Sequence, residues 1–291
     1  MKFRVPAGAA GTGSDDIYAY TGGRPLAADQ PLLAFVHGAQ HDHSVWGLQS
    51  RYLAHHGYSV LAFDLPGHGR SGGAPLATIE AMAGWLCAAI PAACQAAGIG
   101  AVPPTVVIGH SMGSLIALEA TAAAAGKAPP WLAAVALLGT AVPMRVSDAL
   151  LAAARDDEAR AFDMINFWSS AGINHRPGTP GPGFSTFVQN RRLMERQRPG
   201  VLANDFAACN GYAAGLDRAG ALAVPALYLL AARDQMTPPS AARLAIDATA
   251  NKRVVVIPGC GHNLMAERPD ETLDALRGWL AEVAATPAPA E

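Results

Sequence analysis

The sequence predicts an α/β fold in which helices flank one mostly parallel central sheet. Three observations support this prediction. Short apolar runs bounded by Gly, Pro or Asp recur along the chain, and they have the length of buried strands. Helical patterns separate these runs, an alternation that is typical of parallel sheets. The chain has 291 residues, of which 51% are hydrophobic and 15% charged, and this composition excludes disorder and fits one large core.

Six apolar runs are the predicted strands of this sheet. In chain order they are Leu32–Val36, Val60–Phe63, Thr105–Ile108, Ala134–Leu138, Ala226–Leu230 and Arg253–Ile257. Each run has the length of a strand that is buried on both of its faces. Because helical patterns connect them, successive strands are expected to run parallel.

Three helices are marked by their terminal residues. Thr78 is a suitable N-cap for a helix that runs through Cys87. A second helix is predicted over Ser111–Ala125, with Gly126 ending it. A third begins with Pro269 at its first position and has two acidic residues near its positive end.

A helical region interrupts the alternation after the fourth predicted strand. Between about residues 142 and 215 the sequence shows only helical patterns and a Pro/Gly loop at Arg176–Gly183. We therefore expect a core domain of residues 1–141 and 216–291, with residues 142–215 inserted as a helical cap or lid. The insertion carries enough apolar side chains to line a pocket: Phe162, Met164, Ile165, Phe167, Trp168, Phe184 and Phe187. Of these, Trp168 and Phe167 are our candidate substrate contacts.

Charge and targeting patterns exclude several classes of protein. With 21 basic and 23 acidic residues the chain has no basic stripe, so nucleic acid is not an expected partner. The longest apolar run, Trp131–Met144, is too short to span a bilayer, and no stretch fits a signal peptide. The cysteines form no C-x-x-C pair, so we expect a reduced, cytoplasmic protein. The oligomeric state is left open.

The strongest motif is the G-x-S-x-G segment Gly109–Gly113, which joins an apolar strand to a helix. A sharp strand-to-helix turn exposes the Ser111 hydroxyl, while Gly109 and Gly113 leave room where side chains would clash. The Met112 amide then points toward an anion at the helix N-terminus. The alternative is that Ser111 is an ordinary helix N-cap.

The motif string alone is weak, because the chain contains a second match at Gly69–Gly73. This second match follows a turn instead of a strand, and it runs into Ala74 and Pro75 instead of a helix. We therefore predict that Ser71 is a loop residue. The structural context, and not the string, selects Ser111.

A serine nucleophile needs a base, and the base needs an orienting acid. After a strand-to-helix elbow the expected chain order is serine, then acid, then histidine. Asp234 follows the strand Ala226–Leu230, and His262 follows Arg253–Ile257. These residues and Ser111 thus lie past the carboxyl ends of strands, where open α/β sheets bind ligands. The simpler interpretations are a loop-capping Asp234 and a packed or surface His262.

Asp205 and Asp217 are alternative acids. Both lie in or beside the helical insertion, and neither follows a strand. The strand Ala134–Leu138 is followed by Gly139, Thr140 and Ala141, so the other natural position for an acid lacks one. Asp234 is therefore the predicted orienting acid.

A tetrahedral oxyanion needs a second donor besides the Met112 amide. The first predicted strand ends in His37-Gly38-Ala39-Gln40, where Gly38 allows the chain to pass close to the elbow. The amide of Ala39 is then the expected second donor. Gln40 is the neighbouring alternative and a candidate substrate contact, and a plain strand-ending turn is the simpler interpretation.

Two further clusters of polar residues have ordinary interpretations. His37, His41 and His43 surround Asp42, but zinc needs three or four convergent ligands, and a polar loop near the pocket mouth is the preferred interpretation. We expect no metal and no cofactor. The insertion also carries a group of arginines, Arg191, Arg192, Arg196 and Arg198, that fits a solvated helix face. Attraction of an anionic substrate is the alternative role for these arginines.

With these segments in view, the chain resembles α/β-hydrolase fold proteins of the capped serine-esterase kind. The matching segments are His37-Gly38, Phe63–Ser71, Gly109–Gly113, Asp234 with Pro238, Gly259–His262 and Met265–Pro269. The resemblance spans about residues 15 to 284. It implies that Ser111 is the nucleophile, Asp234 the orienting acid and His262 the base, with an oxyanion hole formed by the amides of Ala39 and Met112. Asp64 is structural in such proteins.

The resemblance leaves more than one reaction open. A serine at position 111 disfavours the haloalkane dehalogenases and epoxide hydrolases of this fold, which have aspartate there. The preferred function is hydrolysis of a small carboxylic ester through an acyl-enzyme. The expected partner is a small-molecule ester or related acyl substrate. The alternatives are a carbon–carbon bond hydrolase or acyltransferase with the same triad, and a non-catalytic ligand-binding protein on the same scaffold. Fold does not determine reaction, so this step rests on analogy.

Overall fold

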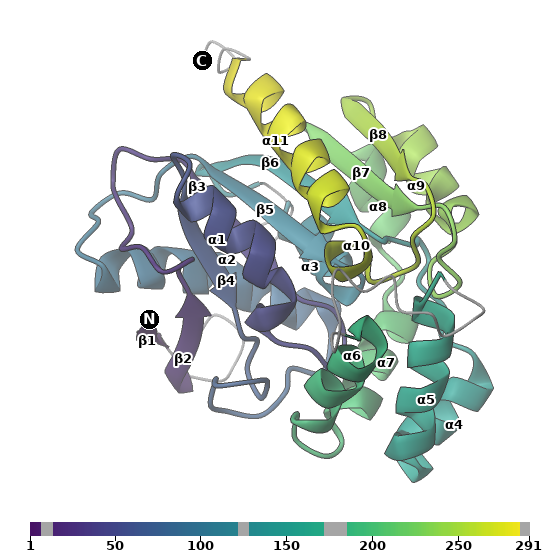
Figure 1. Cartoon of the computed structure of the whole chain (residues 1–291). Coiled ribbons are helices and arrows are strands. Elements are labelled where there is room, and N and C mark those ends of the chain that lie inside the picture. The colour runs from purple at the N-terminus through teal and green to yellow at the C-terminus, as the bar shows by residue number, and fades with distance from the viewer. Residues whose placement is uncertain (7–13, 122–127, 172–184, 286–291) are drawn as a thin grey trace.

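The fold is built on one mixed sheet with helices on its faces. The computed structural model describes residues 1–6, 14–121, 128–171 and 185–285. The strands are β1 (Lys2–Val5), β2 (Ser14–Tyr20), β3 (Leu32–Val36), β4 (Ser59–Phe63), β5 (Thr105–His110), β6 (Leu132–Leu138), β7 (Ala226–Ala231) and β8 (Lys252–Ile257). They lie in the order β1-β2-β4-β3-β5-β6-β7-β8 (Figure 1). Neighbouring strands from β4 to β8 are parallel, which confirms the predicted α/β class.

All six predicted strands are present, with ends that agree within two residues. The antiparallel strands β1 and β2 were not predicted. In β1 the buried residues Phe3 and Val5 alternate with exposed ones, and a pattern this short is not a continuous apolar run. The prediction that every strand is buried on both faces is wrong for β8. This strand is last in the sheet order, and its Val254 and Val256 side chains are 42% and 49% exposed.

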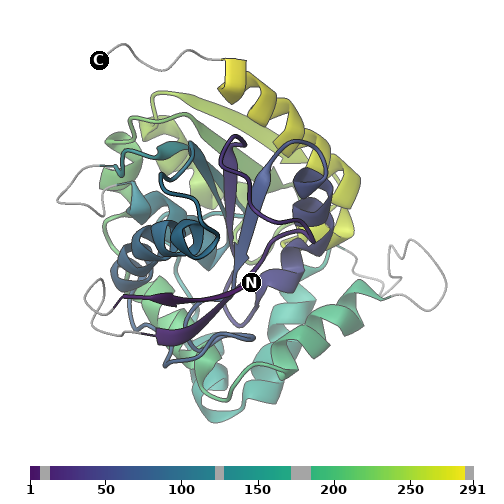
Figure 2. The same cartoon turned by 90° about the vertical axis from the view of Figure 1, so that its left-hand side faces the viewer.

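Helices cover both faces of the sheet (Figures 1 and 2). On one face lie α2 (Ile79–Ala96), α3 (Met112–Ala120), α8 (Gly215–Gly220) and α9 (Arg243–Ala248), and on the other lie α1 (Gly47–Ala54), α10 (Leu264–Glu267) and α11 (Pro269–Ala285). Successive side chains of a strand point to opposite faces. In β3 this places Leu32 and Ala34 in one buried core and Leu33 and Phe35 in the other. Short 3₁₀ turns at His43–Trp46 and Pro239–Ala242 precede α1 and α9.

Helix α2 begins at the predicted N-cap Thr78, whose hydroxyl accepts a hydrogen bond from the Ala81 amide at 3.1 Å. By length and apolar composition it is the one described helix that could cross a membrane. Half of this stretch is buried inside the protein, where α2 packs against α3 and the sheet. A buried helix in the core of a folded domain commonly has this length and composition.

The other two predicted helices are also present, and one of them is shorter than predicted. Helix α11 begins at Pro269 as predicted. Helix α3 ends at Ala120, earlier than the predicted Ala125, and residues 122–127 lie outside the described part of the chain. Residues 286–291 lie outside it as well.

The segment between β6 and β7 contains the insertion helices α4 (Asp148–Asp156), α5 (Glu158–Ser169), α6 (Thr186–Glu195) and α7 (Val201–Gly211). Side chains of Ser147, Asp157 and Ser185 cap three of them. These helices form a small core of their own and gather beyond one end of the sheet (Figures 1 and 2). The Pro/Gly loop at 176–183 and residue 184 lie outside the described residues. The limits of a separate cap domain stay a prediction.

Candidate active site

Ser111 lies in a strained turn between β5 and α3. Its backbone dihedrals are φ 53° and ψ −120°, in a region that residues other than glycine rarely occupy. Such a conformation costs about 1–3 kcal/mol and persists only where the surroundings hold it. Here the Ser111 amide donates to the Leu138 carbonyl of the neighbouring strand at 2.9 Å. The turn thus has the form that presents a serine hydroxyl at the sheet edge.

The two glycines of the motif are required by space. A Cβ atom at Gly109 would lie 2.0 Å from the Gly113 carbonyl oxygen, and one at Gly113 would lie 2.3 Å from the Val36 carbonyl oxygen. Ser114, which follows the motif, fits without disturbing the turn. Its hydroxyl donates to the Ser111 carbonyl at 2.6 Å and lies 2.8 Å from the Thr140 hydroxyl.

Asp234 and His262 form a buried pair. His262 Nδ1 lies 2.7 Å from Asp234 Oδ2, and the two residues are 5% and 4% exposed. The loop after β7 wraps around the carboxylate, because Oδ1 accepts hydrogen bonds from the amides of Met236 and Thr237, each at 2.8 Å. Asp234 therefore both shapes its own loop and faces the histidine.

The Thr237 hydroxyl completes this arrangement. It lies 2.8 Å from Asp234 Oδ2, 2.8 Å from the Gly139 carbonyl oxygen and 3.1 Å from His262 Nδ1. Sequence reasoning missed Thr237. The available clue was its position three residues after Asp234, because aspartate side chains commonly bind backbone amides that follow them in turns.

The electrostatics of the pair favour a charged aspartate. Burial opposes the charge of Asp234, but the His262 charge and the hydrogen bonds from His262 and Thr237 outweigh it and hold the pKa of the carboxyl below its usual range. Because a carboxylate only accepts hydrogen bonds, Nδ1 of His262 carries a proton. When Nδ1 holds the only ring proton, Nε2 is the atom that can act as a base.

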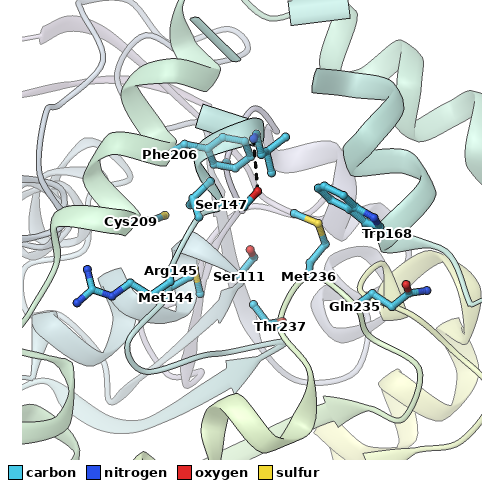
Figure 3. Close-up of a pocket in the computed structure, with 13 residues that line it drawn as sticks. Ser111, Met144, Arg145, Ser147, Trp168, Phe206, Cys209, Gln235, Met236 and Thr237 are labelled. Atoms are coloured by element: carbon cyan, nitrogen blue, oxygen red, sulfur yellow. Dashed lines mark hydrogen bonds between the residues drawn. The ribbon is translucent and has the colours of Figure 1, made fainter. Parts of the chain in front are cut away.

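Ser111 opens into a cavity of about 330 Å³ that it shares with Thr237 and Ala39. Figure 3 shows its hydroxyl among the side chains that line this cavity. Within the described ranges the hydroxyl has no hydrogen-bond partner, so the structure contains no bond from Ser111 to His262. Catalytic hydrogen bonds are often long or absent before substrate binds.

The two predicted oxyanion donors have free amides. Neither Ala39 N nor Met112 N donates to another group among the residues that the structure describes. Gly38 passes close to the elbow, since a Cβ atom there would lie 3.2 Å from Ser111 Cβ. The Gln40 amide, the alternative donor, is already bound to Asp205 Oδ2 at 2.9 Å.

The cavity wall is mostly apolar, and the insertion supplies much of it. Its lining residues are Ala39, Ser111, Met144, Arg145, Val146, Ser147, Leu150, Trp168, Phe206, Cys209, Gln235, Met236 and Thr237. Phe206 and Trp168 lie on one side of Ser111, and the guanidinium of Arg145 points away from it (Figure 3). The arrangement can hold an apolar group beside the serine.

Two of the three candidate substrate contacts do not line this cavity. Trp168 lines it, as predicted. The neighbouring Phe167 side chain points outward and is 54% exposed. Gln40 is 1% exposed, and its amide group donates to the Met194 carbonyl at 3.1 Å, so it links the core to α6 instead. The predictions for Phe167 and Gln40 are therefore corrected.

Two residues that could be mistaken for nucleophiles, Ser71 and Cys260, do not line the cavity. The Ser71 hydroxyl donates to the Asp64 carbonyl at 2.6 Å and accepts from the Tyr18 amide at 3.0 Å, which confirms a loop role. Burial raises the pKa of the Cys260 thiol to about 12, so this cysteine is not a nucleophile at neutral pH.

Donors already occupy the carboxylates that could bind a metal. Oxygen and nitrogen atoms of Asp42, His43 and Asp64 lie within 4.8 Å of one another. The His43 amide and ring Nδ1 both lie 2.7 Å from Asp64 Oδ1, and Arg196 lies 2.6 Å from Asp42 Oδ2. A guanidinium thus supplies the positive charge at Asp42. His41 is not a member of this group, and its Nε2 lies 3.0 Å from Asn190 Oδ1.

Three of the four arginines of the insertion likewise have partners. Arg191 pairs with Asp163 and Glu195, and Arg196 pairs with Asp42. Arg198 donates to backbone carbonyls of the loop that contains Ser71. None of these arginines lines the described cavity, so they do not support the alternative of an anionic-substrate site there.

Comparisons with known proteins agree with the fold. A family model described as the alpha/beta hydrolase family matches residues 33–275. An esterase from Exiguobacterium antarcticum has 18% sequence identity and a TM-score of 0.79, over 97% of this chain and 100% of that one. A thermophilic esterase from Thermogutta terrifontis, with malate bound, has 22% identity and a TM-score of 0.79, over 97% and 99%. The enol-lactonase from Burkholderia xenovorans LB400 has 22% identity and a TM-score of 0.73, over 91% and 96%. No curated protein matches the sequence.

Proposed function

The chain belongs to the alpha/beta hydrolase family, and from this premise we propose that it is a serine hydrolase that cleaves a small carboxylic ester through an acyl-enzyme. One observation carries the proposal. The Thr237 hydroxyl contacts His262 of the buried Asp234–His262 pair. Thr237 also lines the same cavity as Ser111, whose hydroxyl has no hydrogen-bond partner among the described residues. In the proposed triad Ser111 is the nucleophile, His262 the base and Asp234 the orienting acid.

The proposed reaction uses each of these groups in turn. Ser111 Oγ attacks the ester carbonyl while His262 Nε2 takes its proton, and Asp234 stabilises the resulting imidazolium. The oxyanion accepts hydrogen bonds from the amides of Ala39 and Met112, each typically worth about 3 kcal/mol in the transition state. His262 then protonates the departing alkoxide. Water, activated by the same base, attacks the acyl-enzyme and releases Ser111.

We propose that the insertion helices form the cap of this active site. Trp168 on α5 and Phe206 on α7 lie on the cavity wall, and their aromatic surfaces favour an apolar acyl or alcohol group. Cyclic esters belong in the same substrate range, since one structural neighbour is named an enol-lactonase. The cytoplasmic location and the lack of nucleic-acid partners stay proposals from the sequence.

Labelling with a fluorophosphonate probe tests the proposal. We expect mass spectrometry to find the adduct on the peptide that contains Ser111, and p-nitrophenyl esters or lactones to be hydrolysed. Labelling without hydrolysis of any ester would favour carbon–carbon bond cleavage or acyl transfer by the same triad. A protein that is neither labelled nor active would favour the ligand-binding alternative.

Trp168→Ala is expected to lower kcat/KM about tenfold for esters with longer apolar chains, because the cavity loses an aromatic wall. The effect on the corresponding acetate should be smaller, so the chain-length profile flattens. Steady-state kinetics on a series of p-nitrophenyl esters measures both effects. Phe167→Ala is the matched control, because the adjacent side chain is 54% exposed and should leave the profile unchanged. Equal effects of the two variants would contradict the assignment of this cavity.

A further inference from the structure

A second buried acid–histidine pair connects the insertion to the core. Asp205 on α7 and His68 in the loop after β4 are 0% and 1% exposed. Asp205 Oδ2 lies 2.9 Å from His68 Nε2 and accepts the Gln40 amide at 2.9 Å. One carboxylate oxygen therefore holds two separate core loops. The second of these loops carries Ala39.

The hydrogen-bond partners of His68 require a charged ring. Its Nδ1 lies 3.0 Å from the Pro66 carbonyl oxygen, and its Nε2 faces the Asp205 carboxylate. Both partners are acceptors, so both ring nitrogens must donate. Burial lowers the pKa of His68, but the charge and hydrogen bond of Asp205 outweigh burial and raise it above its ordinary value.

The neighbouring His37 is neutral by the same reasoning. Its Nδ1 lies 2.8 Å from the Gly38 carbonyl oxygen, while its Nε2 accepts the Leu65 amide at 3.2 Å. Burial, followed by the His68 charge, lowers the pKa of His37 to about 4. The two rings pack with centroids 4.9 Å apart. A single positive charge thus faces Asp205 from this side.

Gln40 has a backbone that needs external support. Its φ of 58° is in the left-handed region, which side chains larger than glycine rarely adopt. Insertion helices hold it at two points, through Asp205 at the amide and through Met194 on α6 at the side chain. The peptide that carries the Gln40 amide also follows Ala39, so these bonds restrict the orientation of the Ala39 backbone.

We propose that Asp205 is a positioning residue for the oxyanion-binding loop: by holding the Gln40 amide, it directs the Ala39 amide toward the carbonyl oxygen of the substrate, while charged His68 keeps the Asp205 carboxylate in place. This inference rests on the proposed serine-hydrolase function. It also gives the insertion a second role, because α7 then completes the oxyanion hole as well as lining the cavity.

Asp205→Asn tests the role of this carboxylate with little change in volume. The amide cannot supply the negative charge that His68 requires, and its NH₂ group would oppose the Gln40 amide if it faced that way. We expect kcat on a p-nitrophenyl ester to fall about 100-fold, the typical cost of misplacing a catalytic group. KM should change by less than about threefold, because the oxyanion forms only after substrate binds.

Arg198→Gln is the matched control. Arg198 also joins the insertion to the core, by donating to the carbonyls of Gly73 at 2.9 Å and Ser71 at 3.2 Å. Neither of these hydrogen bonds involves the loop that carries Ala39. The kcat of the Arg198→Gln variant is expected to stay within about twofold of the native value. If the two variants lose kcat equally, or if Asp205→Asn raises KM and leaves kcat unchanged, the positioning role is overturned.

Two further measurements separate this inference from the function on which it rests. Native protein that is neither labelled by a fluorophosphonate nor active on esters overturns both. Native protein that is labelled and active, with an Asp205→Asn variant of native kcat, overturns the positioning role alone. If that variant does not fold, ¹⁵N NMR of the native protein decides: both His68 ring nitrogens should be protonated at neutral pH, and a neutral ring overturns the proposal.

Discussion

Ser111→Ala is expected to lower kcat on a true ester substrate by about 10⁴- to 10⁶-fold, as loss of a triad nucleophile does elsewhere. The same change should abolish fluorophosphonate labelling. Its effect on stability should be small, because the hydroxyl has no hydrogen-bond partner in the described part of the chain and no buried group loses a partner. A backbone φ of 53° is as unfavourable for alanine as for serine, so the strain of the turn should not change. Steady-state kinetics and thermal unfolding measure the two effects separately.

Ser71→Ala is the control for this prediction, because Ser71 belongs to the second G-x-S-x-G match. Its side chain is fully buried and bonded to the Asp64 carbonyl and the Tyr18 amide. Its loss should cost about 1–3 kcal/mol of stability, because a buried donor and acceptor lose their partner. Labelling of Ser111 should persist. Labelling that survives in Ser111→Ala but disappears in Ser71→Ala would contradict the assignment of the nucleophile.

The sheet could be predicted because its central strands are buried on both faces. Continuous apolar runs such as Leu32–Val36 need no knowledge of the tertiary structure to be recognised. Strands at the edge carry less information. In β1 only Phe3 and Val5 face the core, and in β8 the outward Val254 and Val256 side chains look the same in sequence as buried ones. The position of a strand in the sheet order, which a local pattern does not contain, decides its burial.

The candidate site could also be predicted only in part. Residues that follow parallel strands, such as Ser111 and His262, could be placed at one edge of the sheet by topology alone. The contributions of the insertion could not, because helix packing sets them. Phe167 and Trp168 are adjacent on α5 and differ by about 100° around the helix axis, so one points outward and the other lines the cavity. Asp205 is an alternative acid by sequence, but in the structure its carboxylate contacts His68 and the Gln40 amide, next to Ala39.

Asp234→Asn is expected to lower kcat by about 10⁴-fold, the cost of a wrong histidine tautomer in a comparable triad. The geometry dictates how the new amide must lie. Oδ1 of Asp234 accepts the amides of Met236 and Thr237, so the amide oxygen of asparagine must take that position. Its NH₂ group then faces His262 Nδ1. Nδ1 becomes an acceptor, the ring proton moves to Nε2, and the nitrogen that should accept the Ser111 proton is blocked.

Kinetics and labelling rates on the same esters measure this effect, with Asp217→Asn as the control. Asp217 is the other acid that the sequence offered, and it is exposed near the start of α8. Its replacement should leave kcat within about twofold of native, since a surface substitution of this kind touches no reacting group. The fold of Asp234→Asn should survive, because the hydrogen bonds that shape its loop are retained. An Asp234→Asn variant within tenfold of native activity, or an Asp217→Asn variant that loses it, would show that the orienting acid lies elsewhere.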